Sequence, residues 1–134
     1  MLPLVCVVED NPDNQLLVQA ILEDRYAVRA YSDGPSALAA MRESPPDVVL
    51  LDISLPGMDG PDVLDAIRND EMLRSLPVVA FTAHAMRGDA EHFLSLGFDG
   101  YVTKPIVDEM LLFDTLDRCL TRARRSAIAS QGAA

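Results

Sequence analysis

The chain has 134 residues, of which 49% are hydrophobic and 24% are charged. This length and composition fit one globular domain with its own core, and no apolar run approaches the ~20 residues that a membrane-spanning helix needs. The formal net charge of −10 argues against nucleic acid and anionic membranes as direct partners.

Two features indicate a cytoplasmic protein. The first residues, Met1 to Val8, lead straight into a strand-like segment without a basic stretch or a small-residue cleavage site, so secretion is not indicated. Cys6 and Cys119 have no companion His or Cys at metal-ligand spacing, which predicts two buried, reduced thiols.

Five short apolar runs alternate with longer stretches that have helical spacing. This alternation predicts repeated strand and helix units around a mostly parallel sheet. The first, third and fourth runs are continuously apolar, so we expect those strands to be buried on both faces. In chain order the runs are Leu4 to Val8, Ala27 to Tyr31, Val48 to Leu51, Pro77 to Phe81 and Gly100 to Thr103.

The first three helices have recognisable starts or ends. Asn11 and Pro12 are a cap and first-turn pair, and apolar residues then recur at helical spacing. The second helix opens at residues 33–35 and ends before Pro45 and Pro46, and the third runs from Asp59 to Asp70. The apolar residues at helical spacing in the first helix are Leu17, Val18, Ile21 and Leu22. In the third helix, Val63, Leu64 and Ile67 face inward.

The fourth helix is expected over about Met86 to Leu96, with Gly97 as its C-terminal cap. The last helix begins near Val107, and its apolar stripe consists of Met110, Phe113, Leu116 and Leu120. It ends in the basic cluster Arg122, Arg124 and Arg125, whose charges complement the helix dipole. Residues 1–125 therefore form the domain, and the small, polar residues 126–134 are expected to be a flexible C-terminal tail.

Polar side chains follow four of the five apolar runs. Glu9 and Asp10 follow the first, Asp52 the third and Thr82 the fourth, and Lys104 comes directly after the fifth. Because ligands of a parallel sheet bind at the carboxyl ends of its strands, we expect three carboxylates, a hydroxyl and an ammonium to converge at one edge.

This combination of groups suits phosphoryl transfer. Clustered carboxylates raise one another's pKa unless a cation neutralises them, and Mg²⁺ is preferred over Ca²⁺ because no EF-hand loop is present. Lys104 suits a phosphoryl oxygen, Thr82 is a donor, and a carboxylate can be the nucleophile. Taken singly, each residue could be a helix cap or a solvated charge, but five of them at successive strand ends favour a site.

Four segments resemble the response-regulator receiver family, of the CheY-like superfamily. They are residues 7–11 (VVEDN), 50–60 (LLDISLPGMDG), 79–83 (VAFTA) and 101–105 (YVTKP), and the resemblance covers about Leu4 to Arg122. Residues 82–89 look most like stand-alone cell-cycle regulators and hybrid-kinase receivers. The resemblance implies an α/β fold: a single (βα)5 flavodoxin-like domain whose five-stranded parallel sheet has the order 2-1-3-4-5, with helices on both faces.

The resemblance also implies a role for each site residue. Asp52 would accept the phosphoryl group, and Glu9, Asp10, Asp52 and the backbone carbonyl of Ser54 would bind Mg²⁺. Thr82 and Lys104 would contact the phosphoryl group, together with the amides of Ile53 and Ala83. Thr82 and Tyr101 would form the switch, with Tyr101 turning inward when Thr82 moves toward the phosphate.

His84 and Leu16 each have two interpretations, and His92 has one. In the family, the positions of Ser54 and His84 tune the loss of phosphate, while His84 could equally be an exposed first-turn residue of the fourth helix. His92 is a solvated helix residue, since the donor histidine resides on a separate protein. Leu16 either helps to dock that protein or is a scattered surface leucine.

The function predicted from these features is that of a two-component response regulator receiver. It would take a phosphoryl group from a histidine kinase or phosphotransfer protein and signal to a downstream protein partner. Alternatively, it would act mainly as an intermediate in a phosphorelay or belong to a hybrid kinase. It would assist its own phosphorylation and dephosphorylation without being an enzyme, and pairing through the fourth helix, fifth strand and fifth helix would give a homodimer.

Three rival functions fit less well. An aspartyl-phosphate hydrolase places a second Asp two residues after the nucleophile, where this chain has Ser54. A flavin carrier needs donors for its phosphate where this chain has Glu9 and Asp10, which would repel the anion. A receiver-like scaffold that takes no phosphate is disfavoured because every required side chain is present.

Overall fold

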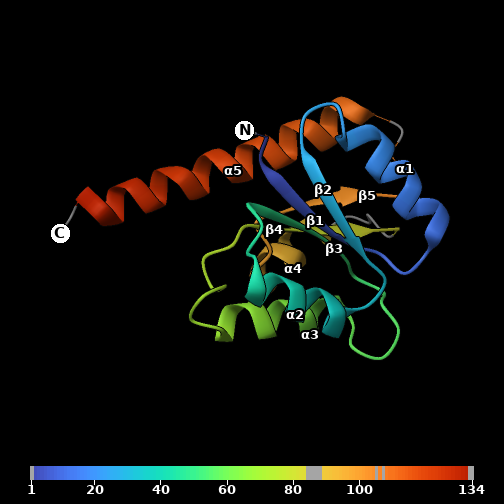
Figure 1. Ribbon diagram of the computed structural model, residues 1–134, viewed down its shortest axis with the longest axis horizontal. Helices are drawn as coiled ribbons and strands as arrows, with labels where there is room; N and C mark the ends of the chain where they lie inside the picture. The colour runs from blue at the N-terminus through green and yellow to red at the C-terminus, as the bar shows by residue number, and fades with distance from the viewer. Residues whose placement is uncertain (1, 84–88, 105, 107, 133–134) are drawn as a thin grey trace.

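The computed structural model describes residues 2–83, 89–104, 106 and 108–132. Strands and helices alternate along the whole described chain, which confirms the predicted (βα)5 organisation (Figure 1). The strands are β1 (Leu4–Val8), β2 (Ala27–Tyr31), β3 (Val48–Asp52), β4 (Val78–Thr82) and β5 (Gly100–Thr103). The helices are α1 (Pro12–Leu22), α2 (Gly34–Glu43), α3 (Gly60–Asn69), α4 (Asp89–Leu96) and α5 (Glu109–Gly132).

The five strands form one parallel sheet between two layers of helices. The strand order is β2-β1-β3-β4-β5, as the family resemblance implies. Helices α1 and α5 pack on one face of the sheet, and α2, α3 and α4 pack on the other. The domain is therefore a flavodoxin-like α/β sandwich in three layers.

The central strands are buried on both faces, as their continuous apolar sequences predict. Every residue of β3 and β4 is buried, and β1 is buried except at Leu4. Successive side chains of a strand point to opposite faces, so each strand contributes to both cores. In β3, for example, Val48 and Leu50 belong to the core beneath α1 and α5, whereas Val49 and Leu51 belong to the core beneath α2, α3 and α4.

Side-chain caps begin the first three helices. Asn11 Oδ1 accepts from the Asp13 amide at 2.9 Å, Asp33 Oδ1 from the Ser36 amide at 2.8 Å, and Asp59 Oδ1 from the Asp62 amide at 3.0 Å. In each case proline occupies the first turn, where its missing N–H costs nothing. These caps fix where each chain segment turns away from the carboxyl edge of the sheet.

Two residues of the predicted apolar stripes lie outside the core. Leu17 is 45% exposed and Met110 is 52% exposed, so neither lies in the core. Helical spacing identifies the direction of an apolar face but not its width, and the buried faces of α1 and α5 are narrower than the apolar stripes. The expected start of α4 near Met86 lies outside the described residues.

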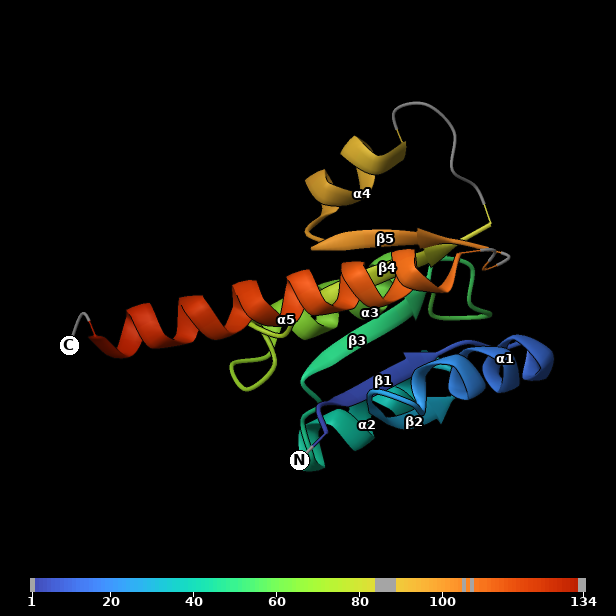
Figure 2. The ribbon, with the colours of Figure 1, turned by 90° about the horizontal axis from the view of Figure 1, so that it is seen from above.

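Helix α5 is longer than predicted. Its buried side chains end at Leu120, but the backbone remains helical to Gly132, seven residues beyond Arg125 (Figure 2). The alanine-rich sequence after Arg125 contains nothing that stops a helix before Gly132. Whether the segment is flexible stays a prediction, and residues 133–134 lie outside the described residues. No helix in the described part of the chain combines the length and apolarity needed to cross a membrane.

Candidate functional site

The carboxyl edge of the sheet brings together the five polar residues that the sequence places after strands. Asp52 ends β3 and Thr82 ends β4, while Glu9 with Asp10 and Lys104 directly follow β1 and β5. The parallel register aligns these ends: Val8 pairs with Leu51, Asp52 with Phe81, and Thr82 with Thr103. The sheet itself therefore positions the cluster.

Three carboxylates lie close together at this edge. Ligand oxygens of Glu9, Asp10 and Asp52 are all within 4.8 Å of one another. Glu9 and Asp52 are buried, whereas Asp10 is exposed. Burial, followed by the nearby charge of Glu9, raises the pKa of Asp52, while hydrogen bonds from Ser54 and Lys104 oppose that rise.

Lys104 is the cation of the cluster. Its Nζ atom lies 2.7 Å from Glu9 Oε2 and 2.9 Å from Asp52 Oδ2, and 4.8 Å from the centre of the Phe81 ring. Burial lowers the pKa of Lys104, but the two carboxylates together raise it above its ordinary value. Lys104 is therefore charged at neutral pH.

The charges of the cluster do not balance. One ammonium faces three carboxylates, and Glu9 Oε2 has no well-aligned hydrogen-bond donor among the described residues. An excess of closely spaced carboxylate oxygens is the donor set that a hard divalent cation such as Mg²⁺ takes. The residues present therefore fit a divalent metal.

Backbone contacts hold the two buried carboxylates. The Ser54 amide donates to Asp52 Oδ1 at 3.0 Å, and the Asn11 amide donates to Glu9 Oε1 at 3.1 Å. Gly60 packs against the Asp52 backbone so closely that an added Cβ would lie 2.6 Å from the Asp52 carbonyl oxygen. The Ile53 amide, expected to contact a phosphoryl group, donates to the Phe81 carbonyl at 3.1 Å and is thus engaged within the sheet.

The two predicted switch residues occupy different environments. Thr82 is buried, and its carbonyl accepts the Lys104 amide at 2.7 Å. Tyr101 is 38% exposed, and its ring centre lies 6.3 Å from that of Phe93 on α4. The tyrosine thus lies at the surface between β5 and α4. His84 and Pro105, also singled out in the sequence, lie outside the described residues.

Sequence reasoning missed Gln15, in the first turn of α1. Its side-chain amide donates to the Glu9 carbonyl at 2.5 Å and to Ser32 Oγ at 3.1 Å. Neither contact leaves a sequence signature, since one acceptor is a backbone atom and the other lies 17 residues away.

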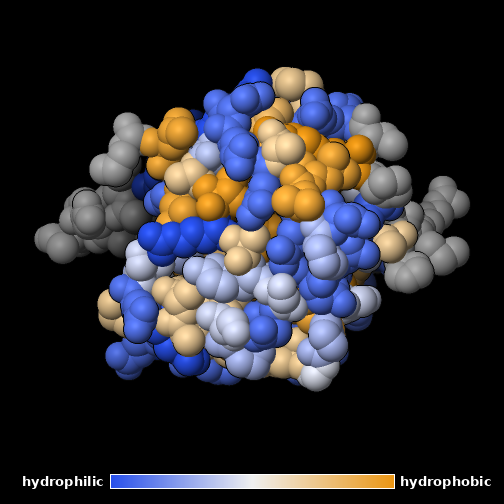
Figure 3. Space-filling view, turned by 45° about the vertical axis from the view of Figure 1, so that its right-hand side comes forward, coloured by the Kyte–Doolittle hydropathy of each residue, from blue (hydrophilic) through white to orange (hydrophobic). Residues whose placement is uncertain are grey.

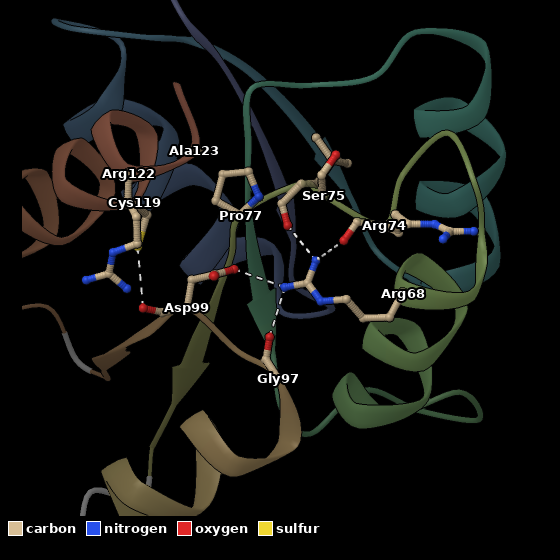
Figure 4. A pocket seen from close by; sticks show the side chains of 10 residues that line it. Arg68, Arg74, Ser75, Pro77, Gly97, Asp99, Cys119, Arg122 and Ala123 are labelled. Carbon is tan, nitrogen blue, oxygen red and sulfur yellow. Dashed lines mark hydrogen bonds and ion pairs between the residues drawn. The ribbon is translucent and has the colours of Figure 1, made fainter. Parts of the chain in front are cut away.

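A cavity lies far from these residues, at the opposite edge of the sheet (Figure 4). It has a volume of about 580 Å³, and its lining includes Arg68, Asp99 and Cys119. None of the predicted site residues lines this cavity. Its size alone therefore does not make it the functional site.

Comparison with known families and proteins gives consistent matches. Residues 5–116 match the response regulator receiver domain. The sensor histidine kinase GacS of Pseudomonas protegens is 46% identical over 113 residues, which cover 81% of this chain but 12% of that protein. The polar-differentiation response regulator DivK of Brucella ovis is 41% identical over 103 residues, covering 76% of this chain and 84% of that protein.

Solved structures agree with these matches. The receiver domain of the sensor histidine kinase PA1611 from Pseudomonas aeruginosa superposes with a TM-score of 0.81 and 34% identity. The match covers 90% of this chain and 99% of that domain, whose structure has a magnesium ion coordinated in the active site cleft.

Proposed function

The chain belongs to the response regulator receiver domain family, the receivers of two-component signal transduction, and on that premise we propose that Asp52 is its phosphoacceptor in a Mg²⁺-binding site. The observation that carries the proposal is the position of Asp52. Its buried carboxylate ends a central strand, contacts the Lys104 ammonium and lies among an excess of negative oxygens.

In the proposed reaction an ionised oxygen of Asp52 attacks the phosphorus of a phosphohistidine on a partner protein. The new O–P bond forms as the P–N bond breaks, and the bonding electron pair leaves with the imidazole nitrogen. The product is an acyl phosphate on Asp52 and a free histidine on the partner. The phosphoryl group ends on the chain itself, so we expect no turnover of a separate substrate.

Lys104 has two tasks in this reaction. Before transfer, its charge favours the ionised, nucleophilic form of Asp52 against the effect of burial. After transfer, the Lys104 ammonium can donate a hydrogen bond to a phosphoryl oxygen, because its flexible side chain needs to move only a short way from the Asp52 carboxylate. The buried Thr82 is the proposed hydroxyl donor beside it.

Glu9, Asp10, Asp52 and the Ser54 carbonyl are the residues that we propose hold Mg²⁺. When bound, the ion would neutralise charge on the transferring phosphoryl oxygens. Two observations support this choice: the uncompensated carboxylates of the cluster and the magnesium ion in the related PA1611 receiver domain.

The proposed output is a change in the surface around Tyr101. Movement of the Thr82 hydroxyl toward a phosphoryl group would leave space into which the exposed Tyr101 ring can turn. The surface near Tyr101 also exposes Leu94 and Leu111, so the rotation would alter an apolar patch that a protein partner could read. The same patch is where a phosphorylation-dependent homodimer would form.

Receiver domains interact with histidine kinases or phosphotransfer proteins, and we propose that the donor docks near α1. Leu16 and Leu17 are both exposed on this helix, which follows the loop that carries Glu9 and Asp10. In Figure 3, apolar side chains gather in the upper half, which holds the α1 and α5 layer, whereas the half with α2 and α3 is largely hydrophilic.

The place of the chain in a pathway is a separate proposal. Similarity to GacS fits a receiver within a hybrid kinase or a phosphorelay, and similarity to DivK fits a stand-alone regulator. Donor proteins of either kind would have to meet the chain in one compartment, for which we propose the cytoplasm. Cell fractionation tests that location.

Phosphorylation by acetyl phosphate tests the proposed acceptor. After incubation with acetyl phosphate and Mg²⁺, the intact mass of the wild type should increase by one phosphoryl group, and EDTA should prevent the increase. Asp52→Asn should show none, while the control Asp24→Asn, at an exposed position after α1, should be labelled normally. Full labelling of Asp52→Asn would show that another residue is the acceptor.

A further inference from the structure

Gln15 joins two loops at the carboxyl edge of the sheet. Its backbone amide closes the first turn of α1 on the Asn11 carbonyl at 3.0 Å. Its side-chain amide then reaches back to the Glu9 carbonyl in the β1–α1 loop and to Ser32 Oγ in the β2–α2 loop. A side-chain amide has two N–H donors, and each of these acceptors can take one.

We propose that Gln15 is a positioning residue that sets the Mg²⁺ affinity of the site. The inference rests on the proposed function and deepens it, because it assigns a role to a residue that contacts neither the phosphoryl group nor the metal. Gln15 acts through the backbone to which two of the three cluster carboxylates are attached.

The Glu9 carbonyl belongs to the peptide that joins Glu9 to Asp10. Fixing its oxygen therefore fixes the plane of that peptide and the direction in which the Asp10 side chain leaves the backbone. Asp10 is exposed, so packing contributes little to its position. The hydrogen bond from Gln15 therefore restrains the position of Asp10, which is not restrained by packing.

Glu9 is anchored on its other sides as well. Its amide donates to the Tyr31 carbonyl at 3.0 Å, and its carboxylate contacts the Asn11 amide and Lys104. The remaining polar atom of Glu9, its carbonyl oxygen, accepts the hydrogen bond from Gln15. Ser32 in turn holds the Gln15 amide from the neighbouring loop, which makes the arrangement a bridge between two loops. Hydrogen-bond partners of this kind around a metal site commonly set its affinity.

Titration calorimetry with MgCl₂ on the full chain tests the role of Gln15. Gln15→Met keeps the side-chain length and the helix propensity but removes both donors. We expect its Mg²⁺ dissociation constant to rise about three- to tenfold. Gln19→Met, one turn further along α1, is the matched control and should leave the constant unchanged.

The kinetics of phosphorylation separate positioning from catalysis. In Gln15→Met, the Mg²⁺ concentration that half-saturates labelling by acetyl phosphate should rise by the same factor, while the rate at saturating Mg²⁺ stays unchanged. A lower rate at saturating Mg²⁺ with an unchanged dissociation constant would overturn the proposal.

Ser32→Ala provides a second test of the proposal, with a substitution that lies outside α1. Alone it should weaken Mg²⁺ binding about two- to threefold, and in the Gln15→Met background it should have no further effect, because Ser32 acts through Gln15. If the wild type and both variants bind Mg²⁺ equally, the role of Gln15 is refuted and the proposed function stands. If the wild type itself binds no Mg²⁺, both are refuted.

Discussion

Partly buried charges lie at both edges of the sheet, the amino edge where the strands begin and the carboxyl edge where they end. The two edges differ in how these charges are paired. At the amino edge, the Arg68 guanidinium donates to the carbonyls of Arg74, Leu76 and Gly97 at 2.6 to 2.9 Å and to Asp99 Oδ2 at 3.0 Å (Figure 4). One cation there meets one carboxylate and three neutral acceptors. At the carboxyl edge, the Lys104 ammonium contacts two carboxylates, and a third, that of Asp10, lies beside them.

The difference distinguishes a structural network from the proposed binding site. The Arg68 network joins the end of α3 to the loops that begin β4 and β5, and its charges cancel, so its contribution is to stability. Among the described residues, the carboxylate cluster retains negative charge after Lys104 has been counted, which would favour the binding of a cation. The cavity lined by Arg68 and Asp99 lies at the first edge, and the proposed chemistry lies at the second.

The largest expected effect is at the amino edge. Arg68→Met would leave three carbonyls without their donor and Asp99 without its cation, so the free energy of unfolding should fall by about 3 kcal/mol. Chemical denaturation measures the loss, and Mg²⁺ affinity should not change. Arg74→Met is the control, because its side chain points away from the Arg68 guanidinium in Figure 4 and its effect should stay within about 0.5 kcal/mol. Equal losses in the two variants would contradict the structural role of Arg68.

Lys104→Met should have a somewhat smaller effect that depends on the metal. In EDTA it leaves the buried Glu9 and Asp52 carboxylates without their cation, so the free energy of unfolding should fall by about 2 kcal/mol. Saturating Mg²⁺ should recover part of that loss by neutralising the same oxygens. Denaturation curves in the two buffers measure both quantities, and an identical loss in each would mean that the metal does not bind near Lys104.

Asp10→Asn should change stability in opposite directions with and without Mg²⁺. In EDTA the variant removes one of three mutually repelling charges and should gain about 0.5 kcal/mol. The wild type should gain about 1.4 kcal/mol at a Mg²⁺ concentration ten times its dissociation constant, and the variant should gain less at that concentration. Thermal unfolding measures both, and a variant that responds to Mg²⁺ like the wild type would exclude Asp10 as a ligand.

The last prediction concerns Cys119, which lines the cavity at the amino edge and whose expected effect is on reactivity rather than on stability. Burial, followed by the nearby charge of Asp99, raises the pKa of this thiol, so the reactive thiolate is scarce at mildly alkaline pH. We expect iodoacetamide to modify it at least about tenfold more slowly in the folded protein than in the unfolded chain. Peptide mass spectrometry follows the reaction, and equal rates would show that this edge is open to solvent.

The sequence is sufficient to predict the alternation of elements and the residues at the strand ends. Continuous apolar runs identify buried strands because few other structures require them. Polar residues directly after such runs mark the ends of the strands and are therefore easy to recognise as candidate site residues. The strand order came from the family resemblance, so the contact of Lys104 with Glu9 could not be predicted from the residues alone. The spacing of apolar residues likewise did not predict how wide the buried face of each helix is, as the exposure of Leu17 and Met110 shows.

Gln15 and Arg68 illustrate what the sequence does not reveal. Arg68 donates mainly to backbone carbonyls, and Gln15 donates to one backbone carbonyl and to the Ser32 hydroxyl, so a local motif identifies neither residue. Their roles depend on loops that only the folded sheet brings together. Such residues are found by asking where each partly buried donor finds its acceptor.

The central claim is that the carboxyl edge of the sheet is a divalent cation site beside Asp52. Crystals soaked in Mn²⁺, which takes the same oxygen ligands as Mg²⁺ and scatters anomalously, test it most directly. The account predicts an anomalous difference peak about 2.2 Å from carboxylate oxygens of Asp10 and Asp52. A map with no peak at this edge, or with its strongest peak at another carboxylate group, would contradict the account.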